Sequence, residues 1–238
     1  MLVPEKQTVY PEYMPDELVR VRRESRQDQL LGYLRQHSDL RILDLRPALS
    51  EAKAKNRIYH RTDTHWNDVG AFTAYQAIVR ALGEDFPEMQ PLPATEFEVV
   101  PSRTHAGDLA VMLGLHATLT EEELNLRPRA PLQARLADGS AVSKSTVGNP
   151  GQYVSERKGE GLPRLVMLSD SFATVFIPFL AEHFSRGVYR WDIKTSPSID
   201  AERSALIEAE RPNIVILEMV ERFLMTPPPT SFSGRAQQ

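Results

Sequence analysis

Residues 165–172 read Leu165-Val166-Met167-Leu168-Ser169-Asp170-Ser171-Phe172. Four apolar residues are followed by three polar ones and then by Phe172. An unbroken apolar run of this length is typical of a strand buried on both faces of a parallel sheet. Apolar residues at helical spacing follow it, at Phe172, Val175, Phe176, Phe179 and Leu180. The pattern predicts a strand followed by a helix, with the polar residues beyond the carboxyl end of the strand, where α/β sheets bind ligands.

The segments on the C-terminal side repeat this alternation of strand and helix. Gly187–Trp191 and the buried run Ile214–Leu217 are predicted strands, and residues 199–210 between them are a predicted helix. We therefore expect an α/β fold with a mainly parallel sheet flanked by helices. The Leu165 and Ile214 runs are expected to be adjacent or nearby strands.

The N-terminal half gives weaker signals. The spacing predicts one helix, or two shorter ones, over residues 16–37, and a strand over residues 40–45. A further helix is expected after the caps Asn67 or Asp68, ending near Gly83.

Two segments lack the periodicity of helices and strands. Residues 86–153 predict long loops with short elements, which would shape a site rather than merely connect strands. The polar, Pro-rich segment 226–238 is expected to be disordered.

The composition of the chain excludes several classes of protein and of functional site. The 238 residues carry a net charge of −4 and have a pI near 5.9, so no global attraction to nucleic acid is expected. The chain has no cysteine, which excludes disulfides, thiolate metal sites and a cysteine nucleophile. No run approaches the ~20 apolar residues of a membrane span, and no apolar signal core follows Met1.

A first candidate for chemistry is Asp63-Thr64-His65-Trp66-Asn67, directly before a predicted helix. In an extended segment, Asp63 and His65 lie on the same side of the chain. The carboxylate can then accept from one imidazole nitrogen and leave the other to act as a base. On spacing alone, a capping and hydrogen-bonding loop explains the pattern as well. A zinc site of His60, Asp63 and His65 is a further alternative, although the helical H-E-x-x-H pattern is absent.

The second candidate is Ser171. A hydroxyl at this strand end lies at the mouth of the sheet, and its backbone N–H, at a helix start, points to where an oxyanion would form. The alternative is that Ser169, Asp170 or Ser171 merely caps the helix.

Together these segments resemble the SGNH-hydrolase-like domain of the alginate O-acetyltransferase AlgX/AlgJ family. Asp63-Thr64-His65-Trp66 is similar to its hallmark D-T-H-W, and Asp170-Ser171-Phe172 is similar to its nucleophile block. The other blocks that carry the resemblance are Val3–Glu12, Ser25-Arg26, Leu43–Arg46, Gly107–Ala110 and Glu221-Arg222.

The resemblance implies a permuted SGNH-hydrolase-like, flavodoxin-like domain over residues 1–225. It implies Ser171 as nucleophile, His65 as general base and Asp63 as the residue that orients His65, with no cofactor and no metal. The implied reaction moves acetyl groups onto hydroxyls of an alginate-like exopolysaccharide through an acetyl-serine intermediate. A carbohydrate acetylesterase and a non-catalytic polysaccharide-binding scaffold protein are the alternatives.

Further expectations concern the surroundings of this site. His65 should lie within hydrogen-bonding reach of Ser171. The Ser171 N–H should be one oxyanion donor, and polar residues near other predicted strand ends are Asn149, Arg190 and Arg222. Trp66 is either a platform for a sugar ring or core support behind His65.

The resemblance also implies partners and a location. The partners are a polysaccharide acceptor, a membrane-bound acyltransferase and other exopolysaccharide machinery, at a periplasmic or other extracytoplasmic location. Family members begin with a further strand and helix before V-P-x-K, so these elements are expected to be missing here.

Overall fold

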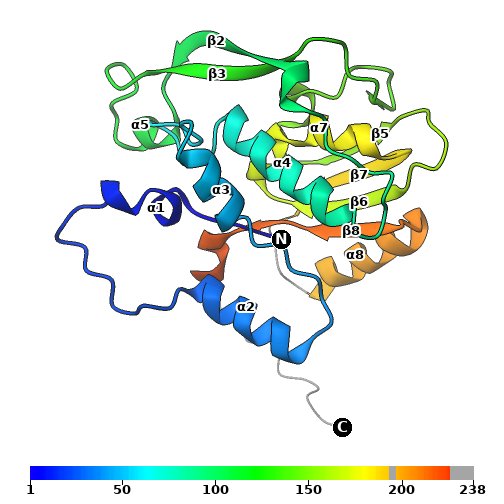
Figure 1. Ribbon diagram of the computed structural model, residues 1–238, viewed down its shortest axis with the longest axis horizontal. Helices are drawn as coiled ribbons and strands as arrows, with labels where there is room; N and C mark the ends of the chain where they lie inside the picture. The colour runs from blue at the N-terminus through cyan, green and yellow to red at the C-terminus, as the bar shows by residue number, and fades with distance from the viewer. Residues whose placement is uncertain (193–196, 226–238) are drawn as a thin grey trace.

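The computed structural model describes residues 1–192 and 197–225 of the chain. Its centre is a five-stranded sheet of order β4-β5-β7-β6-β8 (Figure 1). The strands are β4 (Arg135–Leu136), β5 (Gln152–Glu156), β6 (Arg164–Ser169), β7 (Arg186–Trp191) and β8 (Ile214–Leu217). β6 pairs in parallel with β7 and β8, and Leu165 lies opposite Ile214. The α/β prediction and the adjacency of these two runs are confirmed; β5 and β4 add an antiparallel edge.

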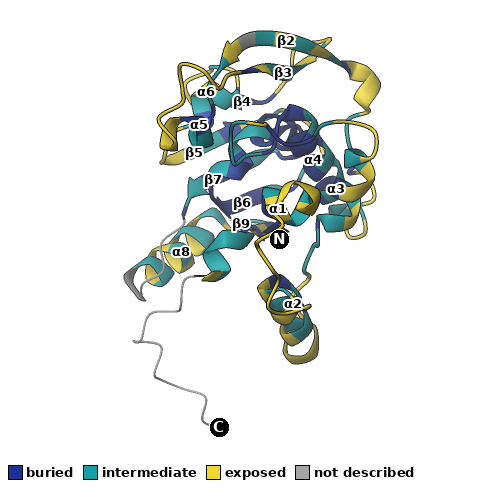
Figure 2. Ribbon diagram, turned by 90° about the vertical axis from the view of Figure 1, so that its left-hand side faces the viewer, coloured by how far each residue is buried: buried dark blue, intermediate teal, exposed yellow. Residues whose placement is uncertain are grey.

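Helices cover both faces of this sheet, and β6 shows why its sequence is apolar throughout. Leu165 and Met167 belong to the large core on the side of α4 (Asp68–Leu82). Val166 and Leu168 point the other way, into a smaller cluster that α8 (Pro197–Glu210) covers. A strand buried on both faces has no solvent side, so its residues do not alternate. Figure 2 shows the central strands buried and the outer surface of α8 exposed.

The predicted cap of α4 is confirmed. The Asn67 side chain accepts a hydrogen bond from the Gly70 N–H at 3.1 Å, which satisfies one of the free N–H groups of the first turn. Gly70 lies against the backbone of Ile58, and a Cβ at this position would be 2.2 Å from the Ile58 oxygen. The helix therefore starts in direct contact with the segment that leads into the candidate site.

The two ends of the described chain meet beside the sheet. β1 (Leu2–Val3) pairs in parallel with β9 (Met219–Val220). The remaining α-helices are α1 (Lys6–Val9), α2 (Arg26–His37), α3 (Arg46–Lys53), α5 (Asp108–Met112), α6 (Lys144–Val147) and α7 (Ile177–Leu180). Short 3₁₀ turns occupy Pro11–Tyr13, Ala94–Glu96, Ser171–Val175, Ala181–His183 and Glu221–Met225.

The segment expected to be mostly loops contains a long hairpin. β2 (Phe97–His105) and β3 (Glu121–Pro128) pair antiparallel and project over the sheet, at the top of Figure 1. β2 contains Pro101, which interrupts a strand pattern, and the register shifts between Pro101 and Thr104. Phe97 is buried but Val99 is 51% exposed, so β2 lacks the regular alternation of buried and exposed residues that would indicate a strand in the sequence.

The helix expected over residues 16–37 is present only in its second half. α2 begins at Arg26, because Ser25 and Asp28 form a reciprocal capping box there. The strand expected over residues 40–45 is not formed; a single bridge joins Leu2 to Asp44. β1 has two residues and offers no longer partner.

Two expectations near the C-terminus also need correction. Pro178 stands in the first turn of α7, so the helix predicted after β6 is broken into 3₁₀ and α segments. β8 is buried on one face only: Val215 and Leu217 are 46% and 53% exposed and line an open groove of about 720 Å³. An apolar run alone does not tell an edge strand from a central one.

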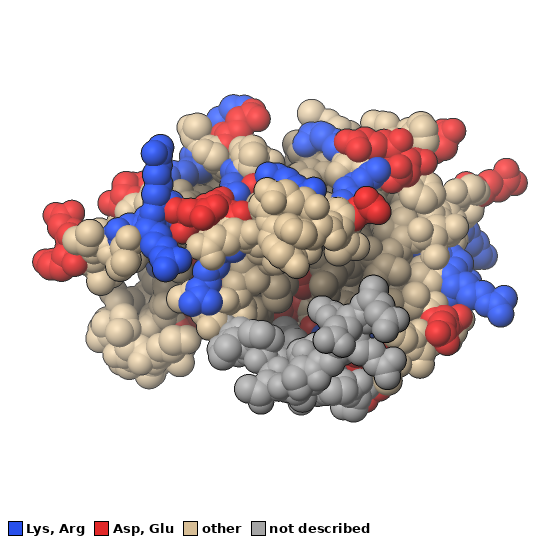
Figure 3. All heavy atoms as spheres, turned by 90° about the horizontal axis from the view of Figure 1, so that it is seen from below, with Lys and Arg blue, Asp and Glu red and all other residues tan. Residues whose placement is uncertain are grey.

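The surface and the chain end complete the description. Figure 3 shows acidic and basic side chains interspersed on the face seen from below. Among the described residues, no helix is both long and apolar enough to cross a membrane. The segment 226–238, expected to be disordered, lies outside the described residues.

Candidate active site

Asp63, His65 and Ser171 converge beyond the carboxyl end of β6. The His65 Nδ1 lies 2.7 Å from Asp63 Oδ1, and the His65 Nε2 lies 2.8 Å from Ser171 Oγ, although 106 positions separate the two residues. The expected hydrogen-bonding distance is therefore confirmed. Because a carboxylate can only accept, Nδ1 donates to Asp63, and the lone pair of Nε2 faces the Ser171 hydroxyl.

The carboxyl of Asp63 is held ionised by its donors. Burial opposes its charge, but the ring and the backbone N–H of His65 and the N–H of Asp108 all donate to it. These bonds outweigh burial and keep the pKa of Asp63 well below its usual range. An ionised Asp63 fixes the tautomer and the orientation of His65.

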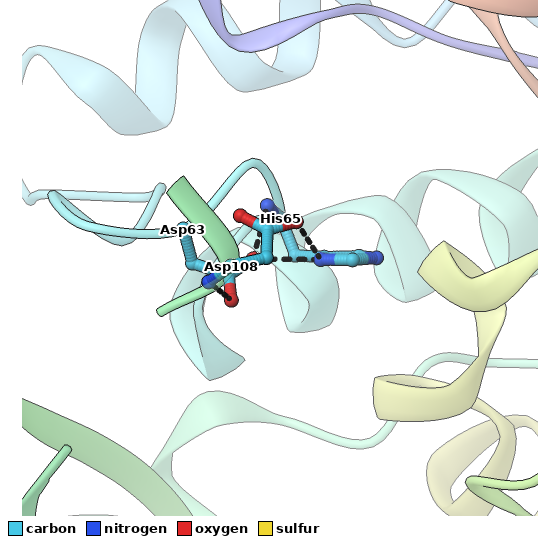
Figure 4. A group of neighbouring side chains, drawn as sticks. All are labelled: Asp63, His65 and Asp108. Carbon is cyan, nitrogen blue, oxygen red and sulfur yellow. Dashed lines mark hydrogen bonds and ion pairs between the residues drawn. The ribbon is translucent and has the colours of Figure 1, made fainter. Parts of the chain in front are cut away.

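Asp108, at the start of α5, holds the same loop from the other side. Its carboxylate accepts from the Thr64 N–H at 2.7 Å and from the Thr64 hydroxyl at 2.5 Å, while its own N–H donates to Asp63 Oδ2 at 3.0 Å. Figure 4 shows Asp108 approaching the Asp63–His65 pair from its own element. Asp108 Oδ2 also lies 3.8 Å from His65 Nδ1.

The close approach of α5 depends on Gly107. A Cβ at this position would be 2.4 Å from the Thr62 oxygen and 2.5 Å from the Asp63 Cβ, distances that no real side chain shows. Any larger residue would push α5 away from the loop, and Asp108 with it.

Two further charged residues fix the loop backbone. Glu121, on β3 and only 6% exposed, accepts from the N–H groups of Arg61 and Thr62 at 2.8 and 2.7 Å. Burial opposes the charge of Glu121, but these donors and the Thr62 hydroxyl lower its pKa. Lys6, in α1, donates to the carbonyl oxygens of Arg61 and Asp63 at 2.9 and 3.0 Å. Elements far apart in the sequence therefore determine the path of this loop.

The turn that carries Ser171 is built differently. Asp170 caps it, because its Oδ1 accepts from the Phe172 N–H at 2.9 Å. The capping role among Ser169, Asp170 and Ser171 thus falls to Asp170, and the Ser171 hydroxyl is directed to His65. The Ser171 N–H has no acceptor among the described residues, which leaves it available as an oxyanion donor.

Aromatic packing joins the loop to the turn. The His65 and Phe172 rings are 4.5 Å apart, and the Trp66 N–H donates to the Phe172 oxygen at 3.0 Å. Trp66 has no exposed surface, so it cannot present a face to a sugar. The platform hypothesis for Trp66 is wrong, and the alternative of core support behind His65 describes its position.

The other polar residues considered at strand ends have different surroundings. The Arg222 guanidinium lies 5.6 Å from the centre of the Phe172 ring and is held by Glu5. Arg190 instead pairs with Glu202 on α8. The Asn149 carbonyl accepts from the Tyr153 hydroxyl.

The residues of the zinc alternative are not brought together. His60 faces Glu121 and His105, with ring centres of the two imidazoles 5.6 Å apart. Within residues 1–192 and 197–225, the one group with the spacing of a metal site is Asp63, His65 and Asp108, without His60.

Some residues of the site gave no signal in the sequence. Glu121 lies in a region of the sequence without periodicity. Glu218 accepts from the Asp170 N–H, but a glutamate directly after a predicted strand is also common on protein surfaces. Asp108 was indicated only by the resemblance of the segment Gly107–Ala110 to the family. A buried charge is recognisable only when its long-range partners are known, and single-sequence patterns do not contain them.

The α/β sheet, with Asp63, His65 and Ser171 together at its carboxyl edge, has the architecture of an SGNH-hydrolase-like domain, and comparison with known families gives the assignment. The chain belongs to the family described as "SGNH hydrolase-like domain, acetyltransferase AlgX", which it matches over residues 1–149. This range contains Asp63 and His65 and ends before Ser171.

Individual relatives agree with this assignment. The "Probable alginate O-acetylase AlgJ" of Pseudomonas aeruginosa is 31% identical over 174 residues, which cover 72% of this chain and 43% of the relative. The chain thus spans less than half the length of this relative.

Solved structures share the fold. A DHHW family protein from Eubacterium siraeum matches with a TM-score of 0.72 at 16% identity, covering 95% of this chain and 78% of that one. The O-acetyltransferase domain of Pseudomonas putida AlgJ matches with a TM-score of 0.58 at 20% identity, covering 97% and 77%. At these identities the likeness concerns the fold alone.

Proposed function

We propose that this protein transfers acetyl groups to hydroxyls of an exopolysaccharide through an acetyl-Ser171 intermediate. The observation that carries the proposal is the continuous hydrogen-bonded chain from Asp63 through His65 to Ser171, with links of 2.7 and 2.8 Å. Membership of an acetyltransferase family supports the acetyl group as cargo.

The first half-reaction forms the acetyl-enzyme. His65 Nε2 takes the proton of Ser171 as the hydroxyl oxygen attacks the acetyl carbonyl. The negative charge that develops on the carbonyl oxygen is stabilised by the Ser171 N–H. His65 then gives the proton to the departing oxygen of the donor, and the acetyl group stays on Ser171.

The second half-reaction reverses these steps with a new partner. A sugar hydroxyl gives its proton to His65 and attacks the acetyl-Ser171 carbonyl. Ser171 leaves and recovers the proton from His65. If water replaces the sugar, the same site is an acetylesterase, so access of the acceptor separates the two activities.

The wider setting is part of the same proposal. Residues 1–225 act as one domain, and an acidic, alginate-like polymer is the acceptor. The protein works at an extracytoplasmic location with a membrane-bound acyltransferase and other exopolysaccharide machinery. Family membership is the support for these points.

Intact-protein mass spectrometry tests the intermediate. After incubation with a small activated acetyl ester, we expect the parent to gain one acetyl group and Ser171→Ala to gain none. Ser169→Ala is the matched control, because Ser169 is a buried serine at the end of β6, two positions before Ser171. Acetylation of Ser171→Ala to the same extent as the parent contradicts the assignment.

A second measurement separates transferase from esterase. The acetyl-enzyme is supplied with an oligosaccharide acceptor, and acetylated sugar and free acetate are quantified. Dominant sugar product supports the transferase, and acetate alone at every acceptor concentration supports the esterase.

A further inference from the structure

Two buried carboxyl groups lie directly beneath the Ser171 turn, and the acetyl-transfer steps use neither. Asp170 is 3% exposed and Glu218 is 2% exposed, and the Asp170 N–H donates to Glu218 Oε2 at 2.9 Å, so the two residues are in direct contact. Among the described residues, neither forms an ion pair with a Lys or Arg side chain. Two adjacent buried carboxylates that no Lys or Arg side chain pairs with repel each other strongly.

The surrounding donors distinguish the two groups. Asp170 Oδ1 accepts from the Phe172 N–H at 2.9 Å, and Oδ2 accepts from the Val220 N–H at 2.7 Å. Glu218 Oε2 accepts from the Asp170 N–H at 2.9 Å, whereas Glu218 Oε1 is buried without a donor. The two N–H bonds favour charge on Asp170. A proton on Glu218 removes the charge from the carboxyl that lacks a donor, and it relieves the repulsion between the two groups.

We propose that Asp170 and Glu218 share one proton, carried by Glu218, and that this pair positions the Ser171 turn. Asp170 ties the turn at Phe172 to β9 at Val220, and Glu218 holds the main chain of Asp170. The residue before Ser171 is thus fixed through both its side chain and its backbone. Glu218 is a positioning residue, and this role rests on the proposed function of Ser171. The shared proton is independent of that function.

The groups that face the pair come from several elements. Burial, followed by the charge of Asp170, raises the pKa of Glu218 well above its ordinary value, and the amino group of Met1, directly before β1, opposes this. Burial also raises the pKa of Asp170, against its backbone donors and the nearby His65. A carboxyl whose pKa is higher in the folded than in the unfolded chain stabilises the fold most at low pH. Its contribution is lost as the pH rises above the unfolded value.

Thermal unfolding of the full chain tests the shared proton without reference to activity. Glu218→Gln keeps a neutral hydrogen-bonding side chain that cannot ionise. Between about pH 5 and about pH 9, we expect the Tm of the parent to fall more steeply than that of Glu218→Gln. Glu208→Gln, an exposed change on α8, should follow the parent. Equal slopes for the parent and Glu218→Gln overturn the proposal.

Infrared spectroscopy of the unmodified protein gives a readout that needs no folded variant. A protonated carboxyl has a C=O stretching band distinct from the carboxylate bands. Among the described residues, Asp170 and Glu218 are the carboxyls whose pKa is raised. We expect such a band at neutral pH and its loss at alkaline pH, and its absence at neutral pH overturns the shared proton.

Esterase assays test the positioning role. Glu218→Gln should stay within about threefold of the parent, whereas Glu218→Ala should lose about tenfold or more, because the Asp170 N–H is left without an acceptor. Equal losses in both folded variants overturn the positioning role. If the parent itself has no activity, the proposed function fails, while the unfolding and infrared results still decide the shared proton.

Discussion

At the loop that carries Asp63 and His65, the half-buried Asp63 and the buried Glu121 are surrounded by hydrogen-bond donors, whereas beneath the Ser171 turn two buried carboxyls lie next to each other. Asp63 and Glu121 accept bonds from backbone and side-chain donors, and their pKa values are lowered although burial opposes their charge. Asp170 and Glu218 have fewer donors, and burial raises their pKa values. The balance between burial, like charge and donated hydrogen bonds thus sets the direction in which the pKa of each acid moves.

This difference predicts opposite responses to pH. Carboxyls with lowered pKa values stabilise the fold above their unfolded pKa, and their contribution is lost as the pH falls. The raised pair stabilises the fold at low pH and loses its contribution as the pH rises. The loop is therefore the acid-sensitive half of the site, and the turn is the alkali-sensitive half.

The largest expected effect comes from Asp63→Asn. The amide no longer enforces the tautomer in which His65 Nδ1 donates, so turnover of an activated acetyl ester should fall by about a thousandfold or more. The check is kcat in a variant that cooperative thermal unfolding shows to be folded. Asp39→Asn, an exposed substitution, is the control and should match the parent. A loss below about tenfold for Asp63→Asn would show that His65 does not depend on this carboxylate.

Gly107→Ala displaces the loop while every proposed catalytic residue keeps its identity. The new Cβ would overlap Thr62 and Asp63, so Asp63 must move, and a displacement of about 1 Å costs on the order of a hundredfold in rate. Gly32→Ala, in α2, is the matched control, because a Cβ there meets nothing within 4 Å. Esterase kinetics with both variants check this, and equal activities would mean that α5 does not position Asp63.

The same two regions explain what the sequence could reveal. The strand, the cap and the position of Ser171 follow from local patterns, because β6 is apolar throughout and Asp170 caps its own turn. The loop depends on Lys6, Asp108 and Glu121, whose bonds to it span 44 or more positions. Local periodicity contains no information on such partners, so only the resemblance indicated that His65 meets Ser171.

The errors in the fold prediction have a related cause. The exposed face of β8 and the hairpin of β2 and β3 depend on which neighbours cover a strand, and not on the strand's own residues. Val215 and Leu217 have the sequence of a buried strand but lie at a sheet edge. Whether a strand is buried on one face or on both depends on its place in the sheet, and the sequence of a single apolar run does not contain that information.

Glu121→Gln tests the pH dependence of the loop's stability and should lower activity less than the two preceding substitutions. The amide keeps one acceptor for Arg61 and Thr62 but loses the charge, so we expect about 1–3 kcal/mol of lost stability at neutral pH and about a tenfold loss of activity. Because the pKa of Glu121 is lowered in the folded chain, the loss relative to the parent should shrink as the pH falls below the ordinary glutamate value. Unfolding curves between pH 7 and about pH 3 measure this, with the exposed Glu122→Gln as control. A constant difference at every pH would contradict the charged role of Glu121.

Trp66→Phe tests the link between the two regions and should have the smallest effect on rate. The substitution removes the indole N–H that donates to the Phe172 oxygen, and it leaves this buried carbonyl without that donor. We expect a stability loss of about 1–3 kcal/mol and a fall in kcat of only a few fold, because the hydrogen bonds of the Asp63–His65–Ser171 chain remain.

Tyr59→Phe is the matched control for Trp66→Phe. It also deletes a buried donor to a carbonyl, that of Pro4, but its bond leads to the N-terminal segment and not to the Ser171 turn. Both variants should therefore lose similar stability, measured by denaturant unfolding, while kcat should fall only for Trp66→Phe. If Tyr59→Phe lowers kcat as much, the loss reflects general loosening of the core, and the indole bond is no special connection between His65 and the Ser171 turn.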